Sequence, residues 1–280
     1  MKRFTPFEHW QTDCLRSGAF ADLNVMFALC EHPQWPSLVS LNQHSVKNSQ
    51  GKPLEFIANE EFEQDGRYYE TFIYETGKVP TRLQNWHDLF GAYIWRLFPK
   101  TKALLNRLHI EEMAVQPCAQ RSKKRNALTL FDECAVILAV TDDSWADAFR
   151  NHQWQEVFVE RRGDWYDGTQ GSIRAYTFGH ANYEMLTQPF IGLTGKALFV
   201  KVAADIFCKD LSAQYAYLDE RLYEMIATDN VLADNRALSP LPLLGVPYWH
   251  QANIDPTFYA NTDYFRPKRR NKNNDKGERA

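Results

Sequence analysis

The most regular hydrophobic pattern in the chain follows Pro80. Apolar side chains recur there at helical spacing until Pro99: Trp86, Leu89, Phe90, Tyr93, Ile94, Leu97 and Phe98. Thr81, followed three residues later by Gln84, has the form of a capping box. This pattern predicts a helix over 82–98. The opposite face of that helix is also apolar, since it carries Gly91, Ala92 and Trp95, and this indicates burial on both sides.

Shorter patterns predict the remaining elements. Helical spacing indicates helices over 20–29, 100–109, 144–152, 179–188 and 210–228. Alternating or aromatic and β-branched residues indicate strands over 69–74, 155–160, 172–178 and 196–202. The segment 127–140 has helical spacing, but its last part, 135–140, fits a buried strand equally well. From Ser239 to Pro267, prolines stand among aromatic residues without any period, which is typical of an ordered extension wrapped on the body.

Composition narrows the class of protein. The chain has 280 residues, of which 44% are hydrophobic and 24% charged, as in a globular protein rather than a low-complexity or disordered one. Its longest uncharged apolar run, 134–140, is far shorter than the roughly 18 residues that span a membrane. The start of the chain lacks the apolar stretch of a secretory signal, and the 5 cysteines include no C-x-x-C pair. We therefore expect a cytoplasmic protein with reduced thiols and no membrane partner.

The net charge of −3 is the sum of two unlike parts. Residues 266–280 contain 7 Lys and Arg against 2 acids, a net of +5, so residues 1–265 carry a net of −8. Acids are dense over 55–75, which favours a solvated acidic face there. An acidic body repels a polyanion. Nucleic acid binding is therefore unexpected for the body, and the basic loop 121–125 and the tail 266–280 are the segments that could contact phosphates.

His87 is the first candidate for chemistry. On the predicted helix it lies at the shoulder of the apolar stripe, beside Phe90 and Ile94, whereas Asp88 points to the other face. An imidazole titrates near neutral pH, so His87 suits a general base or a buried ligand. The alternative is a core histidine bonded to a carbonyl or carboxylate, which is the more frequent role of such a residue.

Asp132 and Glu133 are the second candidate. If their segment is helical, they share one polar strip with Arg125 and Thr129 on an otherwise apolar surface. Neighbouring carboxylates can share a proton or hold a divalent cation. The alternative is a structural network in which an arginine neutralises both acids, with Arg82, Arg121 and Arg125 available for this.

His180 and Glu184 are the third candidate. They stand at i and i+4 on a helix that begins just after a predicted strand, so both can face one metal ion. The alternative, an ordinary His–Glu hydrogen bond, is more frequent because this spacing often arises by chance. The chain lacks the phosphate-binding, dinucleotide-binding and nucleophile-elbow motifs and has no H-E-x-x-H. These absences disfavour phosphoryl transfer from nucleotides, Rossmann dehydrogenase, α/β-hydrolase and zincin protease chemistry.

Several short sequence motifs, taken together, resemble an uncharacterised bacterial family, the domain of unknown function numbered 3025. They are GKVPTR at 77–82, NWHDLF at 85–90, FPKTK at 98–102, ALTLFDE at 127–133, FGHA at 178–181, GVP at 245–247 and FRP at 265–267. The resemblance covers nearly the whole chain up to Pro267 and implies a bacterial protein with one family-wide domain. It implies no cofactor and no catalytic residue.

These observations predict an α+β fold that is mainly helical. We expect a single globular domain over 1–265 with a small sheet and a long proline and aromatic C-terminal extension, followed by a basic disordered tail over 266–280. The first functional hypothesis is a hydrolase assisted by a divalent metal, with His180 and Glu184 as ligands and His87, Asp132 and Glu133 as catalytic residues. It requires His87, Asp132 and His180 to reach one pocket. The alternative is a non-enzymatic protein that binds protein or RNA through the loop 121–125 and the extension.

Overall fold

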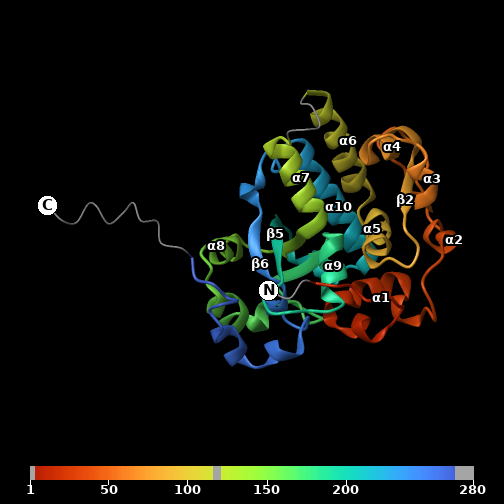
Figure 1. The fold of residues 1–280 in the computed structure, drawn as a ribbon. Coiled ribbons are helices and arrows are strands. Elements are labelled where there is room, and N and C mark those ends of the chain that lie inside the picture. Colours follow the sequence, from red (N-terminus) through yellow and green to blue (C-terminus); the bar gives the residue numbers. More distant parts are fainter. Residues whose placement is uncertain (1–3, 116–120, 269–280) are drawn as a thin grey trace.

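The computed structural model describes residues 4–115 and 121–268, and the structural statements below concern these residues. Helices predominate and two small sheets accompany them, so the predicted α+β class is confirmed (Figure 1). No helix in the described ranges is long and apolar enough to cross a membrane.

The larger sheet has four strands in the order β4-β3-β5-β6. Its centre is β3 (Ala135–Val140), in which every residue is buried, as expected of a strand covered on both faces. β3 pairs antiparallel with β4 (Ile173–Thr177) and parallel with β5 (Thr194–Lys201), and β5 pairs antiparallel with β6 (Ser239–Pro242). The ambiguous segment 127–140 thus contains both predicted elements, a helix and then a strand.

Five helices carry the candidate residues or pack against the helices that carry them. They are α5 (Trp86–Leu97), α6 (Pro99–Val115), α7 (Lys123–Cys134), α9 (His180–Leu186) and α10 (Leu211–Ala227). α5 packs on α9, α7 packs on both α9 and α6, and α10 packs on α6 (Figure 1). α7 leads directly into β3, and the turn from β4 into α9 lies beside that junction.

The smaller sheet joins the N-terminal part of the chain to this group. β1 (Glu55–Ala58) and β2 (Lys78–Thr81) pair in parallel, and the chain between them forms α3 (Asn59–Glu63) and α4 (Tyr69–Thr76). α4 packs on α6, while α1 (Ala21–Phe27) contacts α10. The remaining helices are α2 (Leu38–Leu41) and α8 (Ser144–Arg150).

Two predicted strands are wrong. Residues 69–74 lie in α4, whose buried Phe72 and Ile73 are adjacent residues and whose end is set by Gly77 at a φ of +78°. Residues 155–160 lie mostly in a π-helical turn, Glu156–Glu160, in which the adjacent Val157 and Phe158 are both buried. Adjacent buried residues suit a helical turn, because a strand would send one of them to each face.

The predicted start of the central helix is also wrong. Thr81 ends β2, and α5 begins only at Trp86. Asn85 is the N-cap, since its Oδ1 accepts a 3.1 Å hydrogen bond from the backbone N–H of Asp88. Gln84 adopts a φ of +56° in the turn between them and therefore cannot serve as a capping-box residue.

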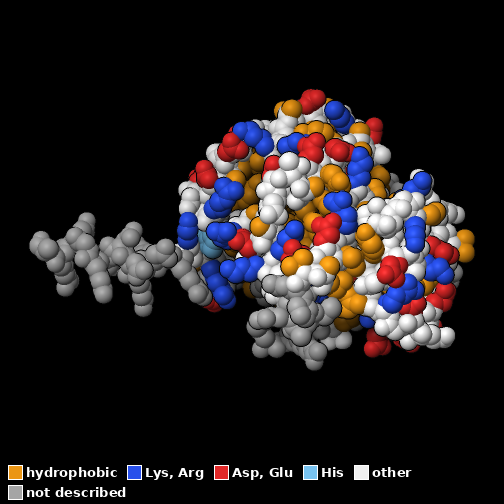
Figure 2. Space-filling model, turned by 90° about the horizontal axis from the view of Figure 1, so that it is seen from above, with side chains coloured by type: hydrophobic (Ala, Val, Ile, Leu, Met, Phe, Trp, Pro, Cys, Tyr) orange, Lys and Arg blue, Asp and Glu red, His pale blue; other side chains and the backbone are white. Residues whose placement is uncertain are grey.

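The segment 121–125 is only partly a loop. Ser122 caps α7 and the three residues after it are helical. Arg125 is 2% exposed and so offers no surface charge to a polyanion. Acidic and basic side chains are mixed over most of the face shown in Figure 2.

The C-terminal extension packs on the body up to its last described residue. The Tyr264 hydroxyl donates a 2.6 Å hydrogen bond to the carbonyl of Leu193, and the Trp154 indole N–H donates a 2.8 Å bond to the carbonyl of Arg266. Lys268 contacts Asn151 at 2.8 Å. The first residues of the predicted tail therefore lie against the body, whereas 269–280 fall outside the described residues.

Candidate metal centre

A glycine brings the first histidine of the centre into place. Gly179 precedes α9, and a Cβ at this position would stand 2.5 Å from the carbonyl oxygen of Glu133 and 2.6 Å from the amide nitrogens of Cys134 and Ala135. Only glycine allows two backbones to approach this closely. His180, the first residue of α9, therefore lies directly beside the end of α7.

The second histidine faces the first across a helix–helix contact. His87 lies in the first turn of α5, which packs on α9. The Nε2 atoms of His87 and His180 are 3.0 Å apart, and their ring centroids are 4.3 Å apart with the rings nearly perpendicular. The two imidazoles thus point the same nitrogen at each other.

The other nitrogen of each ring is already engaged. His180 Nδ1 lies 2.9 Å from the backbone carbonyl of Asp132, and His87 Nδ1 lies 3.2 Å from Oε2 of Glu184. A carbonyl or a carboxylate can only accept, so each Nδ1 carries the proton. In the neutral tautomers this leaves two Nε2 lone pairs directed at one another.

A carboxylate completes the cluster. Oε2 of Glu133 lies 3.6 Å from Nε2 of His180 and 3.9 Å from Nε2 of His87. These distances are too long for hydrogen bonds. Together with the 3.0 Å between the two Nε2 atoms, they lie around the separation of neighbouring ligands on a tetrahedral ion, and a point roughly 2.1 Å from all three atoms exists, which is the distance at which Zn²⁺ binds nitrogen and oxygen ligands. Within the described ranges, His87, Glu133 and His180 form one group with the geometry to hold a metal ion.

The local environment keeps one histidine neutral and favours charge on the other. Burial lowers the pKa of His180 to about 4, and the positive charge of Lys102 acts in the same direction. For His87, burial also opposes the charged form, but the hydrogen bond to Glu184 and the charge of Glu133 outweigh it and raise the pKa. Burial raises the pKa of the Glu133 carboxyl. The raised pKa of His87 favours a proton on its Nε2, which faces Nε2 of the neutral His180 ring.

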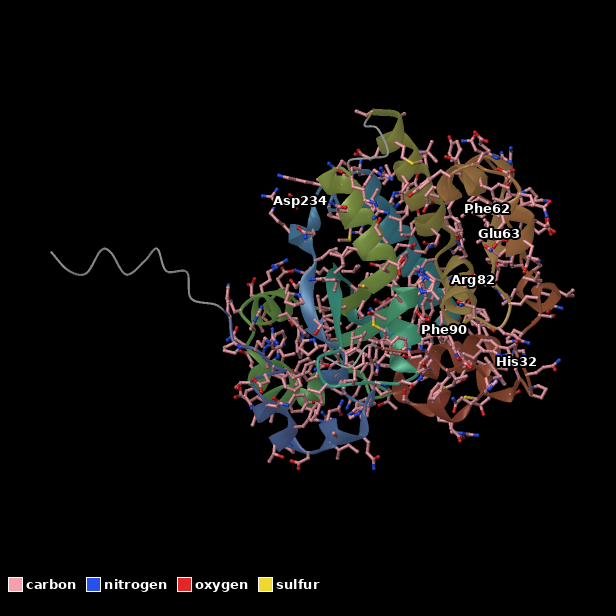
Figure 3. The ribbon with its side chains drawn as sticks, viewed as in Figure 1. His32, Phe62, Glu63, Arg82, Phe90 and Asp234 are labelled. Carbon is pink, nitrogen blue, oxygen red and sulfur yellow. The ribbon has the colours of Figure 1, made fainter. Side chains whose placement is uncertain are left out.

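The cluster opens into a cavity of about 600 Å³. His87, Glu133 and His180 line it together with Asp132, so these candidates from three helices share one space. Arg82 and Glu63, which also line the cavity, are labelled in Figure 3 on the side of α3 and β2. The space is large enough for a small organic ligand beside the metal position.

Asp132 and Glu184 serve the cluster indirectly. The Asp132 carboxylate lies 2.5 Å from Nζ of Lys102, and its backbone carbonyl orients His180. Glu184 contacts His87 on the nitrogen that faces away from the cluster. Lys102, and not an arginine, therefore neutralises Asp132, while Arg82 pairs with Asp88 at 2.8 Å.

Sequence reasoning missed most of the remaining cavity wall. Asn106 and His109 of α6 and Tyr69 and Glu70 of α4 all line it. Both Asn106 and His109 are buried polar residues, 3% and 7% exposed, on a helix with apolar neighbours. Asn106 and His109 are three residues apart, a spacing that places two polar side chains on one face of a helix. The sequence does not show that this face of α6 lines a cavity.

Comparison with known families decides the classification of the chain. The family described as a protein of unknown function (DUF3025) matches residues 54–269. The chain belongs to the DUF3025 family. No curated protein and no solved structure matches it. The resemblance drawn from the sequence motifs is therefore confirmed, while a bacterial origin stays a prediction.

The sequence motifs that resemble DUF3025 contribute residues to the wall of the cavity. GKVPTR contributes Thr81 and Arg82, NWHDLF contributes His87, and FPKTK contributes Lys102. ALTLFDE and FGHA supply the rest of the cluster, namely Asp132, Glu133 and His180. Five segments that are distant along this DUF3025 chain thus meet in one place.

Proposed function

We propose that this protein is a metal-dependent hydrolase. His87 and His180 bind a divalent cation through Nε2, and Glu133 binds it through Oε2. The observation that carries the proposal is the 3.0 Å approach of two Nε2 atoms whose rings are both held at Nδ1. In this scheme Glu184 and the Asp132 carbonyl position the two histidines.

The electrostatics of the pair support a cation. Two lone pairs that face each other at 3.0 Å repel unless a proton or a metal ion lies between them. Histidines that ligate a metal almost always donate their second N–H to a carboxylate or a backbone carbonyl, and both kinds of acceptor occur here. Two imidazoles and one carboxylate form a donor set typical of catalytic zinc.

Three protein ligands leave a coordination position free for water. A zinc ion at such a site lowers the pKa of bound water to about 7 and polarises a carbonyl or phosphoryl oxygen. Lys102 is 8% exposed, lines the same cavity and is fixed by Asp132, so its ammonium group is placed to attract negative charge that develops on a substrate oxygen. These features support hydrolysis of an ester or amide bond.

A nucleic acid role for the body has less support. Arg125 is buried and offers no charge to a polyanion, which leaves Arg121 and Lys123 as the exposed basic residues of 121–125. Acidic side chains also stand among the basic ones on the face in Figure 2, and these would repel a polyanion. The segment 269–280 stays outside this comparison because the structure does not describe it.

Metal binding tests the proposal directly. Purified protein should contain, or take up after dialysis against chelator and titration with Zn²⁺, Mn²⁺, Co²⁺ or Fe²⁺, one divalent ion per chain. His180→Ala and Glu133→Gln should abolish this uptake, and Glu184→Gln should weaken it by about 10–100-fold, as for other residues that orient a metal-binding histidine.

His9→Ala is the matched control, since His9 is exposed and lies outside the cavity. It should bind metal like the wild type. Wild-type protein that binds none of the four ions, or His180→Ala and Glu133→Gln variants that bind them normally, would overturn the proposal.

A further inference from the structure

The polar strip of α7 extends well beyond the metal centre. Glu133, Asp132, Thr129 and Arg125 lie on one side of this helix at helical spacing. The first three line the cavity. At 1.5 Å per residue, Arg125 lies roughly 12 Å along the helix from the metal ligand Glu133. The strip therefore has a metal end and a cationic end.

Arg125 is a buried cation that forms no ion pair with any of the residues that the structure describes. It is 2% exposed, and its Nε and Nη1 have no hydrogen-bond partner within the part of the chain that the structure describes. A buried charge is costly unless it is paired. Its charge nevertheless reaches the cavity, where it acts on Glu70 and His109.

The surrounding groups do not balance this charge. Lys102 is already paired with Asp132. Glu70 is an acid on which the charge of Arg125 acts, and burial, only partly offset by the hydrogen bond from Asn106, raises its pKa to about 7. When Glu70 is protonated, the charges on this wall are Lys102 and Arg125 against Asp132 and Glu133, and both acids lie at the metal end of the strip. Arg121 adds a further cation at the edge of the same cavity.

Two further groups on this wall lack partners. His109 Nδ1 and Asn106 Oδ1 are buried without a hydrogen bond among the described residues. Burial also lowers the pKa of His109 to about 4, so the ring is neutral and keeps one N–H donor. Asn106 uses its amide nitrogen on Glu70 at 2.7 Å, which leaves its oxygen to accept a donor from a ligand.

We infer that the cationic end of the strip binds an oxyanion of the substrate, a carboxylate or a phosphoryl group, while the bond to be hydrolysed lies at the metal end. Arg121 and His109 contact the anion and the buried Arg125 supplies the field that attracts it. The substrate would thus be an anionic ester or amide with a donor group near its charge. The second half of this inference rests on the proposed hydrolase function, whereas the anion subsite does not.

Oxyanion binding to the full chain tests the subsite. Inorganic phosphate and acetate are titrated separately into metal-free and zinc-loaded protein, with calorimetry or thermal shift as the readout. Fragment-sized anions should bind with dissociation constants of about 1 mM, and the stronger of the two identifies the phosphoryl or the carboxylate class. Arg121→Gln, an exposed position, should weaken binding several-fold, and Arg125→Gln should weaken it at least about tenfold.

Lys123→Gln is the matched control, because it removes the same charge from the same helix at an exposed position outside the cavity. It should bind both anions like the wild type. Far-UV circular dichroism and the melting temperature show whether Arg125→Gln is folded. If Arg125→Gln does not fold, the exposed variant Arg121→Gln alone tests the subsite.

Two results would overturn the subsite. One is no saturable binding of either anion up to about 10 mM, a concentration above the expected dissociation constant. The other is binding that requires zinc and is unchanged in both arginine variants, since the anion would then be a metal ligand. Failure of the hydrolase proposal looks different: metal does not bind, but the metal-free protein still binds an oxyanion in an Arg121- and Arg125-dependent way.

Discussion

Replacing Glu70 by glutamine should stabilise the protein in a strongly pH-dependent way. Burial raises the pKa of the Glu70 carboxyl from 4.5 to about 7, against the opposing hydrogen bond from Asn106. Between these two pH values the folded state holds a proton that the unfolded state has released. The wild type therefore loses stability as the pH rises from about 4.5 to 7, and the loss is complete above pH 7.

The size of the effect follows from the shift. A difference of about 2.5 pKa units corresponds to roughly 3 kcal/mol at about 1.4 kcal/mol per unit. Glu70 is only half-buried, so solvent weakens the penalty of ionising it. We therefore expect the ionised carboxylate to lower the free energy of unfolding by about 2 kcal/mol. Glutamine keeps an oxygen that can accept from Asn106, whose Nδ2 now donates to Glu70 Oε2 at 2.7 Å. The substitution thus removes the charge while leaving the hydrogen bond intact.

Urea unfolding of both proteins at pH 5 and pH 8 measures this difference. Glu70→Gln should be nearly as stable as the wild type at pH 5 and more stable by about 2 kcal/mol at pH 8. Glu55→Gln, at an exposed position of β1, should show no such dependence. Two outcomes would refute this reasoning: an equal stability difference at the two pH values, or a variant that is less stable than the wild type at pH 8. In either case Glu70 is ionised without penalty, and its negative charge offsets the positive charge of Arg125.

Three further results should follow from the geometry. Metal affinity should fall as the pH drops through neutrality and below, because the raised pKa of His87 makes a proton compete for Nε2; calorimetry in buffers of different ionisation enthalpy should show proton release on binding, and a pH-independent affinity would contradict this. Gly179→Ala should lower the free energy of unfolding by about 1–3 kcal/mol and abolish metal uptake, because its Cβ would stand 2.5 Å from the Glu133 carbonyl oxygen. Normal metal uptake would show that the backbone at this turn can shift to make room for the Cβ. Tyr264→Phe should cost about 1–3 kcal/mol, because it removes the 2.6 Å hydrogen bond to the Leu193 carbonyl and leaves the buried Leu244 N–H without its 3.0 Å acceptor; an unchanged urea midpoint would mean that the extension is not part of the cooperative unit.

The sequence predicted the identity of the candidate residues better than their roles. Helical spacing placed His180 and Glu184 on one face of α9, and both do reach the same histidine. The sequence could not show that α5 packs against α9. This packing places the His87 ring between the side chains of His180 and Glu184. Glu184 therefore meets the outer nitrogen of His87, and the carboxylate at the inner side comes from Glu133 on α7.

Glu70 shows why part of the cavity escaped prediction. Seven acids over 55–75 favour a solvated face, and the residues after Tyr69 have strand-like composition. The segment is instead a helix that packs on α6, and this contact turns Glu70 toward Asn106. Tertiary packing overrode both the local propensity and the charge pattern, neither of which contains information about α6.

The polar strip of α7 shows how a sequence feature can be assigned to function rather than to stability. Among residues 4–115 and 121–268, Nε and Nη1 of the buried Arg125 have no hydrogen-bond partner, although an apolar residue of similar size would avoid the cost of burying that charge. Departures from local rules of this kind concentrate at functional sites. On the same face of the same helix, Glu133 and the Asp132 carbonyl converge with two histidines whose Nε2 atoms lie 3.0 Å apart. One helix thus carries a buried cation at one end and a metal-binding carboxylate at the other, and a substrate whose oxyanion lies at the cationic end while its scissile bond lies at the metal end would engage both.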